Sequence, residues 1–316
     1  MKRWMSLLLL CIWLPACAGL AEPAYEKYRY YFFNTFDTVV TLTAYAKDQA
    51  EFDAYAALVE SEMTRYHRVF DLYHAYDGVY NLNYLNENAG KEPARAEPEL
   101  IDLLQLIKAW RAEYGTALDP AMGGVLGLWH DAREDGTVLL EQAAQHMDYD
   151  QVIIDPNTLT VFYADPVILL DLGAVAKGYA AQLVAQTLAE QGLDSFLLNA
   201  GGNVVCGAPP KDGRDSWTIA IEDLDGVSTR EKIYVSGLSV VTSGDYQRYY
   251  TVDGVNYHHL IDPETLYPAA HMRAVTIVHP DSGLADFLST TAFLLPYADS
   301  RRLIERIGGA EGMWTL

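Results

Sequence analysis

Residues 171–180, which read DLGAVAKGYA, decide how the rest of the chain is interpreted. The apolar run 167–170 precedes them and a glycine follows at position 173, a pattern that predicts a buried strand entering a glycine turn. Beyond the turn, apolar residues recur at spacings of three and four until Gly192, which predicts a helix with a glycine stop. The stretch is therefore expected to form a strand, a turn and a helix.

Two charged residues mark this junction. Asp171 would end the strand, and Lys177 would lie in the first turn of the helix. A cation at that place opposes the helix dipole, and a bound anion such as a phosphate would offset the cost. The alternative is an ordinary strand–turn–helix junction with a solvated lysine.

Size and charge restrict the class of protein. The chain has 316 residues, half of them apolar, which suffices for a substantial core in one large domain or two intimate ones. Its formal net charge is −21, which excludes binding of nucleic acid or anionic lipid through the general field of the protein. A phosphorylated small molecule would need a local device, and the excess of carboxylates makes a divalent cation the natural choice.

The first 17 residues are predicted to be a targeting segment. Lys2 and Arg3 precede an apolar run, 4–13, that is too short to span a bilayer comfortably. Leu-Pro-Ala-Cys then resembles a lipobox, in which Cys17 becomes the lipidated first residue of a bacterial lipoprotein, although proline is unusual there. The alternative is plain secretion with cleavage between residues 16 and 21. We therefore expect an extracytosolic protein, lipid-anchored on the periplasmic or outer face of a membrane.

The remainder is predicted to be a tether, 18–27, and a single domain, 28–316. Removing the leader takes the net charge to −23, because the leader contains two cations and no acidic residue. Cys206 would then be the one possible free thiol, so no internal disulfide is expected and this cysteine should pack as a small apolar residue.

Hydrophobic periodicity predicts an α+β fold, with largely antiparallel sheets flanked by helices. Polar loops and short turns are expected over 72–97, and a glycine-rich apolar segment over 122–129. Strands are expected at 28–45 as a pair or one long strand, and at 149–154, 160–163, 196–199, 217–222, 231–235, 239–241, 249–257 as a hairpin, and 274–279. Helices are expected at 50–70, 99–114, 283–295 and 298–307.

One predicted helix carries a possible metal site. Asp286 and Thr290 are four residues apart, so they share a helix face. A carboxylate and a hydroxyl are hard oxygen ligands, which suit Mg²⁺ better than zinc. The alternative is a capping or solvent-facing pair.

Two further blocks contain groups that suit acid–base chemistry or phosphate binding. In HHLIDP, His259 and Asp262 could form a base and its orienting carboxylate, or be a surface histidine beside a turn. The turn expected at 242–246, TSGDY, could hold a phosphate or could be an ordinary polar turn.

Six blocks taken together are far more specific than any one of them. In order they read ALDPAMGGVLGLW, DLGAVAKGYA, LLNAGGN, VTSGDYQRYY, YHHLIDPETLYP and ADFLSTTAFLL. This series resembles the ApbE family, flavin transferases that take FAD and attach FMN to a protein. The resemblance runs from about residue 32 to 295, and it implies an ApbE-like (T-fold-like) domain with an active site between two intimate subdomains.

The resemblance implies roles for individual residues. The main-chain oxygen of Ala174 and the side chains of Asp286 and Thr290 match the family's ligands for Mg²⁺, with Mn²⁺ as an alternative metal. His259 matches the first histidine of H-I-I-D-P, and either it or Asp262 would accept the proton of the attacking hydroxyl. The positions that match flavin-dinucleotide contacts are Phe36, Ala117, Leu118, Asp119, Asp171, Lys177 and Leu260.

Two positions depart from the family pattern. Leu266 stands where D-P-x-T-G usually has glycine, so the turn after Pro263 is expected to differ. Asp37 stands where many members have glycine in M-G-T, although a subset has F-D-T as here. Neither position belongs to the implied metal set.

The function implied by the resemblance is Mg²⁺-dependent transfer of FMN from FAD to a threonine or serine hydroxyl of an acceptor flavoprotein, with release of AMP. The acceptor would be a membrane redox subunit or a secreted reductase. A first alternative uses water as the nucleophile and makes the protein an FAD pyrophosphatase. A second is a lipid-anchored flavin-binding protein without turnover, and the least specific is a purely structural lipoprotein.

Overall fold

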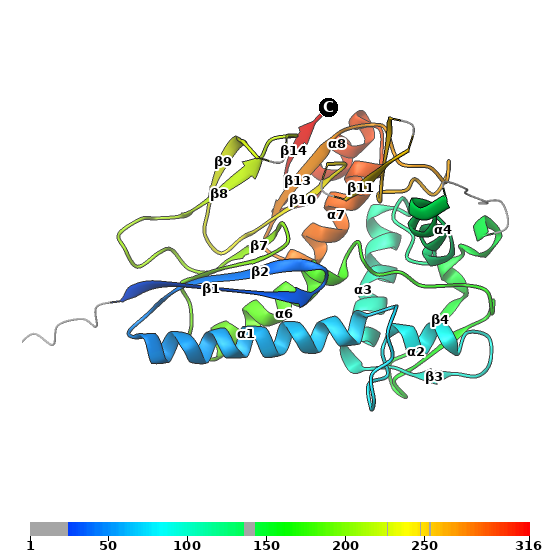
Figure 1. The fold of residues 1–316 in the computed structure, drawn as a ribbon, viewed down its shortest axis with the longest axis horizontal. Coiled ribbons are helices and arrows are strands. Elements are labelled where there is room, and N and C mark those ends of the chain that lie inside the picture. The colour runs from blue at the N-terminus through cyan, green and yellow to red at the C-terminus, as the bar shows by residue number, and fades with distance from the viewer. Residues whose placement is uncertain (1–24, 136–142, 226, 247, 253) are drawn as a thin grey trace, which may run out of the picture.

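The structure of the protein, a computed structural model, describes residues 25–135, 143–225, 227–246, 248–252 and 254–316. Its main element is a seven-stranded sheet in which every neighbouring pair is antiparallel (Figure 1). In spatial order its strands are β1 (Glu26–Thr35), β2 (Thr38–Ala46), β6 (Phe196–Ala200), β7 (Asn203–Cys206), β10 (Ser239–Gly244), β13 (Ala274–His279) and β14 (Glu311–Thr315).

The first hairpin explains one edge of this sheet. Aromatic and β-branched residues favour strands, and the chain reverses at Phe36 and Asp37, whose φ angles are 52° and 50°. Both residues therefore adopt the left-handed conformation, which non-glycine residues rarely occupy. The predicted strand pair is confirmed.

Three helices cover one face of the sheet: α1 (Gln49–Phe70), α6 (Ala176–Glu190) and α7 (Ser282–Leu294). Helix α1 begins at Asp48, whose carboxylate accepts a hydrogen bond from the amide of Glu51, as an N-cap should. Every residue of α7 is buried, because the helix lies between α6, α8 (Tyr297–Glu305) and the strands β10 and β13. The polar side chains of α7 consequently need partners inside the protein.

A hairpin of β8 (Trp217–Glu222) and β9 (Thr229–Val235) covers part of the opposite face. Strands β7 and β10 alternate between the two cores, so Val205 and Val241 pack under the helices whereas Cys206 and Val240 pack under the hairpin. Burial raises the pKa of the Cys206 thiol to about 12. The prediction that this cysteine packs as a small apolar residue is confirmed.

A second group of smaller elements lies on the right of Figure 1, next to the helices that cover the sheet. Its members are α2 (Leu82–Glu87), α3 (Pro98–Tyr114), α4 (Gly123–Asp135), a sheet of β3 (Ala94–Arg95), β5 (Thr160–Tyr163) and β4 (Val152–Asp155), two 3₁₀ turns at 144–146 and 149–151, and the hairpin of β11 (Tyr249–Val252) and β12 (Val255–His258). Part of the group shares the main core, whereas α4 and the β11–β12 hairpin pack around a small core of their own. Together with the main sheet these elements confirm the predicted α+β class.

The predicted strand at 167–170 is wrong as a regular strand. Ile168 and Leu170 are fully buried, but Val167 and Leu169 are 54% and 42% exposed, and the segment makes a single parallel bridge, from Leu169 to Met122. The segment runs beside residues 120–123 for only a short distance, because the chain turns there into α4. The segment is therefore extended backbone with two hydrogen bonds to its neighbour: the Gly123 amide donates to the Leu169 carbonyl, and the Asp171 amide donates to the Pro120 carbonyl.

Three other expectations need correction. The glycine-rich segment 122–129 is mostly the start of α4, and the loop expected at 72–97 contains α2, which is capped by Asn81. Of the turn expected at 242–246, residues 242–244 belong to strand β10 and the turn follows at 245–246. The C-terminal strand β14 had no counterpart among the expected elements. Within the described ranges, none of the helices combines the length and apolarity needed to cross a membrane.

Candidate active site

Helix α7 touches the beginning of α6 through one buried carboxylate. The Oδ2 atom of Asp286, a residue only 4% exposed, accepts hydrogen bonds from the amide of Gly178 at 2.8 Å and from Nδ2 of Asn203 at 2.7 Å. The Gly178 amide lies in the first turn of α6, where amides lack partners within the helix. Asp286 therefore caps α6, and a negative charge is favourable at that helix end.

Only glycine fits at position 178. A Cβ atom placed there would lie 2.5 Å from Cβ of Asp286 and 2.5 Å from the carbonyl oxygen of Ser282. Both distances are far below van der Waals contact, and one of the obstacles is backbone. Gly178, the second glycine of DLGAVAKGYA, thus sets how closely α6 and α7 approach each other.

Thr290 lies one turn after Asp286 on α7 and is 5% exposed. Its hydroxyl oxygen is 3.2 Å from the Ser243 hydroxyl of β10, and the Ser243 hydroxyl is 2.8 Å from that of Ser289. The solvent-facing alternative for the pair Asp286 and Thr290 is therefore wrong, because both side chains point into the protein.

Ala174 belongs to the turn that leads into α6. In a longer helix the amide of Gly178 would bond back to the carbonyl of Ala174, but here it donates to Asp286 instead. The turn itself is closed by the amides of Val175 and Ala176, which both donate to the Leu172 carbonyl. The turn that contains Ala174 and the Asp286 carboxylate of α7 consequently meet at the start of α6.

Lys177 is the cation shared by three blocks of the site. Its Nζ atom donates to the Gly173 carbonyl at 3.1 Å. The pKa values of Asp171 and Asp286 are both raised overall because burial disfavours the charged carboxylate. The positive charge of Lys177 partly offsets this rise in both residues. The same charge also acts on His259, so residues from the central turn, α7 and the β12 end lie within electrostatic reach of one lysine.

The block 117–119 lies beside Asp171. The amide of Asp171 donates to the Pro120 carbonyl at 2.9 Å, while the carboxylate of Asp119 pairs with Arg111 at 3.0 Å and accepts from the Ala121 amide at 2.8 Å. Burial raises the pKa of Asp119, and Arg111 opposes that rise. The Leu118 carbonyl also accepts a hydrogen bond from Arg111, so Arg111 fixes the backbone of this block as well as its carboxylate. The side chains of Ala117 and Leu118 pack against the main core.

The two adjacent histidines differ in what their ring nitrogens can do. Nε2 of His258 bonds the Ala269 carbonyl at 2.9 Å, and its Nδ1 accepts from the Leu260 amide, so both nitrogens are occupied. In His259, Nδ1 is 3.2 Å from the Arg248 carbonyl, which can only accept; Nδ1 must therefore carry the proton and Nε2 keeps its lone pair. Desolvation by the surrounding protein atoms, together with the charges of Arg248 and Lys177, lowers the pKa of His259 to about 4, although the residue keeps an exposed edge. The ring is therefore neutral near pH 7.

Asp262 does not orient His259 in this structure. Its Oδ1 accepts from the Glu264 amide at 2.8 Å, which closes its own turn, and the backbone carbonyl of Arg248 takes the orienting role. Leu266, at φ = 63°, keeps this turn in the left-handed conformation, and its amide donates to the Asp262 carbonyl. The glycine-type turn is therefore retained, contrary to the expectation that it would differ. Leu260 is buried just before the turn.

Phe36 joins the site through Arg248. The Arg248 guanidinium donates to the Phe36 carbonyl at 3.2 Å, and the Phe36 amide donates to Nδ1 of His67 at 3.2 Å. The positive charge of Arg248 also lowers the pKa values of Asp171 and His259. Arg248 thus connects the β1–β2 turn to the histidine block.

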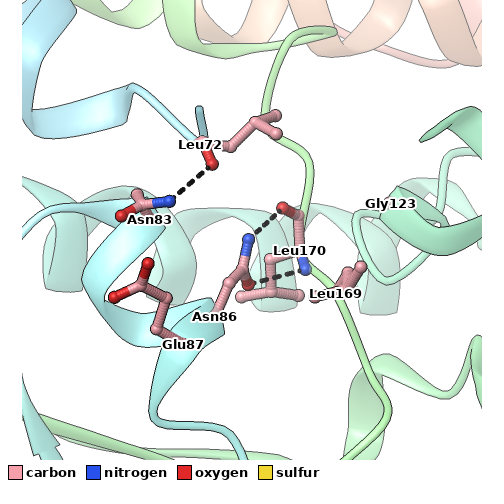
Figure 2. A pocket seen from close by; sticks show the side chains of 7 residues that line it. All are labelled: Leu72, Asn83, Asn86, Glu87, Gly123, Leu169 and Leu170. Carbon is pink, nitrogen blue, oxygen red and sulfur yellow. Dashed lines mark hydrogen bonds between the residues drawn. The ribbon is translucent and has the colours of Figure 1, made fainter. Parts of the chain in front are cut away.

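A cavity of about 310 Å³ lies behind the segment that leads to Asp171 (Figure 2). In Figure 2, Asn86 brackets Leu170: its Nδ2 donates to the Leu170 carbonyl at 3.0 Å and its Oδ1 accepts from the Leu170 amide at 2.9 Å. The cavity is lined by none of the predicted site residues. Instead, Asn86 in the wall of the cavity fixes the backbone of Leu170, the residue just before Asp171.

The residues present fit a hard divalent cation. Both described donors to Asp286 bind Oδ2, which leaves the lone pairs of Oδ1 for a cation, and Thr290 adds a hydroxyl on the same helix face. Among the described residues no three His, Cys, Asp or Glu side chains are grouped as a metal site. The ligand set expected from the sequence accordingly draws on a backbone oxygen and a hydroxyl, which is oxygen chemistry suited to Mg²⁺.

Comparison with known proteins decides the family. The model of the ApbE family matches residues 36–314. A relative from Treponema pallidum named FAD:protein FMN transferase is 32% identical and covers 88% of this chain and 81% of its own. The chain belongs to the ApbE family. A second relative of the same name, from Klebsiella pneumoniae, is 31% identical and covers 72% of this chain and 74% of its own.

Solved ApbE structures share the fold. An ApbE protein from Thermotoga maritima superposes with a TM-score of 0.80 at 28% identity and covers 92% of this chain and 94% of its own. The flavin transferase ApbE from Vibrio cholerae superposes with a TM-score of 0.76 at 21% identity, over 92% of this chain and 98% of its own. The second comparison bears on the fold alone.

Two residues of this candidate site, Asn203 and Arg248, were not predicted as site residues, and Ser243 was predicted only as part of a turn that could hold a phosphate. Asn203 ends the quoted block LLNAGGN, Ser243 lies within VTSGDYQRYY, and Arg248 follows in the same block. Their place in these blocks was visible in the sequence. What the sequence did not contain was their partners, because each bonds a residue at least 11 positions away.

Proposed function

We propose that this protein is an Mg²⁺-dependent FAD:protein FMN transferase, which moves FMN from FAD to a threonine or serine hydroxyl of an acceptor flavoprotein and releases AMP. The observation that carries the proposal is the contact of the Asp286 carboxylate with the first turn of α6, within electrostatic reach of Lys177. Ala174 precedes that helix turn, and Thr290 follows Asp286 by one turn on α7. Membership of the ApbE family, with relatives named for this reaction, supports it.

The reaction requires the pyrophosphate of FAD to be held and its charge neutralised. The main-chain oxygen of Ala174 and the side chains of Asp286 and Thr290 would hold Mg²⁺, which when bound supplies charge neutralisation at the pyrophosphate oxygens. Lys177 contributes a fixed positive charge beside the same carboxylates. These local cations reconcile a net charge of −21 with the binding of an anion.

His259 is the residue that accepts the proton. The acceptor hydroxyl attacks the phosphorus of the FMN half, the anhydride bond breaks, and AMP leaves with the bridging oxygen, while the hydroxyl proton passes to Nε2 of His259. The neutral ring and the Nδ1 proton fixed by the Arg248 carbonyl prepare Nε2 for this task. We place Phe36, Ala117, Leu118, Asp119, Asp171 and Leu260 at the dinucleotide, and Asp262 in support of the His259 turn.

The test is a mixture of the purified protein, FAD, Mg²⁺ and a flavinylatable acceptor domain. We expect a fluorescent acceptor band and AMP in equal amounts, and a loss of about 10²- to 10⁴-fold in rate for His259→Ala, the range typical of a general base. His271→Ala, which changes an exposed histidine in the following segment, serves as the control.

Each other outcome identifies a rival. AMP without labelled acceptor indicates an FAD pyrophosphatase, and unchanged FAD with and without Mg²⁺ indicates a passive flavin-binding protein. A His259→Ala variant that transfers FMN at the wild-type rate removes His259 from the mechanism.

We further propose that the protein acts outside the cytoplasm and is anchored through lipid on Cys17, a residue outside the described ranges. The lipobox-like sequence supports this location. We expect Cys17→Ser to move the protein from the membrane fraction to the soluble fraction of its native host. Retention of the variant in the membrane fraction would show that the anchor lies elsewhere.

A further inference from the structure

A chain of three hydroxyl groups ends at the proposed ligand Thr290. Ser289 Oγ bonds the carbonyl oxygen of Asp286 at 3.0 Å, Ser243 Oγ is 2.8 Å from Ser289 Oγ, and Thr290 Oγ1 is 3.2 Å from Ser243 Oγ. Ser289 is fully buried, and Ser243 and Thr290 are 9% and 5% exposed. Each of these hydroxyl groups must therefore donate its proton in a hydrogen bond to another group of the protein.

The direction of this chain follows from counting protons. A carbonyl oxygen only accepts, so Ser289 spends its single proton on Asp286. Ser243 must then donate its own proton to Ser289, and Thr290 must donate its proton to Ser243. The two lone pairs of the Thr290 hydroxyl are left facing away from Ser243.

We infer that Ser243 and Ser289 are positioning residues for the cation: together they fix the Thr290 hydroxyl with its proton turned away and its lone pairs presented to the metal. This inference rests on the proposed metal ligation by Thr290. A hydroxyl that could rotate would spend part of its time pointing a proton at the cation, which opposes binding. Partners of metal ligands typically change affinity by about 10- to 100-fold when they are removed.

Strand β10 offers a matched control. Thr242 precedes Ser243 and also bonds a hydroxyl, that of Thr276 at 2.8 Å. Neighbouring residues of a strand face opposite sides of the sheet, so the Thr242 pair lies on the side away from α7. Thr242→Val removes a hydroxyl pair of the same kind from the same strand without touching the chain to Thr290.

The experiment measures Mn²⁺ binding by the EPR signal of free Mn²⁺, with the full-length protein alone and with saturating AMP. Thermal unfolding without metal is recorded for every variant. We expect Ser243→Ala to weaken Mn²⁺ binding by at least about tenfold. Ser289→Ala should weaken it less, because Ser243 can then donate either way, and Thr242→Val should leave it unchanged. Thr290→Val, which removes the ligand itself, sets the lower limit.

The outcomes separate this inference from the proposed function. Wild-type protein that binds no Mn²⁺ in either condition overturns the metal site and the inference with it. Wild-type binding that is matched by Ser243→Ala, at equal folding, overturns the inference alone. If Ser243→Ala fails to fold, the order Thr290→Val, Ser289→Ala, Thr242→Val, from weakest to strongest binding, still decides it, because equal binding by the last two contradicts the hydroxyl chain.

Discussion

The interior and the rim of this site hold their residues by different means. In the interior, where α6, α7 and β10 meet, Asp286 receives two donors on one oxygen and Gly178 admits no Cβ atom. At the rim, the turn of Phe36 and Asp37 and the turn at Leu266 keep left-handed backbone without glycine, and Arg248 joins their blocks through carbonyl contacts. The interior therefore depends on particular atoms, whereas the rim depends on backbone shape.

Gly178→Ala should have the largest effect, because it acts on the interior. The added methyl group would push α7 from α6 and break the hydrogen bond to Asp286, which we expect to lower the free energy of unfolding by about 3 kcal/mol. Unfolding in urea measures this change in the free energy of unfolding. Gly127→Ala is the control, because a Cβ atom at this exposed position of α4 meets nothing within 4 Å and alanine favours a helix by up to about 1 kcal/mol. Equal behaviour of the two variants would contradict the tight contact.

His259 lies at the border between the two regions, and its effect on stability should depend on pH. Its pKa is about 4 in the folded protein and ordinarily about 6.5 when unfolded, so the unfolded chain binds more protons between these values. Stability supported by the neutral ring is complete above pH 6.5 and is lost as the pH falls toward 4. We expect the difference in unfolding free energy between wild type and His259→Gln to change in that window and to be flat above it.

A difference that stays constant from pH 4 to 7 would show that folding does not lower the pKa of His259. It would also weaken its assignment as a base that is neutral at neutral pH. The comparison with His259→Gln cancels the contributions of Asp171 and Asp286, whose raised pKa values act in both proteins.

The rim should give the smallest effect. Asp37 is exposed and left-handed, a conformation that aspartate tolerates better than alanine and that glycine adopts freely. Asp37→Ala should cost about 1 kcal/mol of stability, and Asp37→Gly should change it by less than about 0.5 kcal/mol. Chemical denaturation compares them. A loss as large as that of Gly178→Ala would show that the rim is as tightly constrained as the interior.

The sequence predicted most of the fold and the makeup of the site, because both leave local patterns. The spacing of Asp286 and Thr290 placed them on one helix face, and the family blocks pointed to the end of α6. Exposure was harder to predict: the run 167–170 reads as a buried strand, yet two of its four side chains face outward. The partners of Ser243 and Asn203 are more than 40 residues away in sequence, so no local pattern announced them.

The buried thiol of Cys206 has a practical consequence. Under the β8–β9 hairpin it reacts with a maleimide only when that hairpin leaves the sheet, since the reagent needs the thiolate and access to it. With Cys11 and Cys17 replaced by serine, Cys206 would be the single thiol, and its labelling rate would report how often the hairpin opens. The chain thus carries its own probe of local unfolding, placed on the face of the sheet opposite the chemistry.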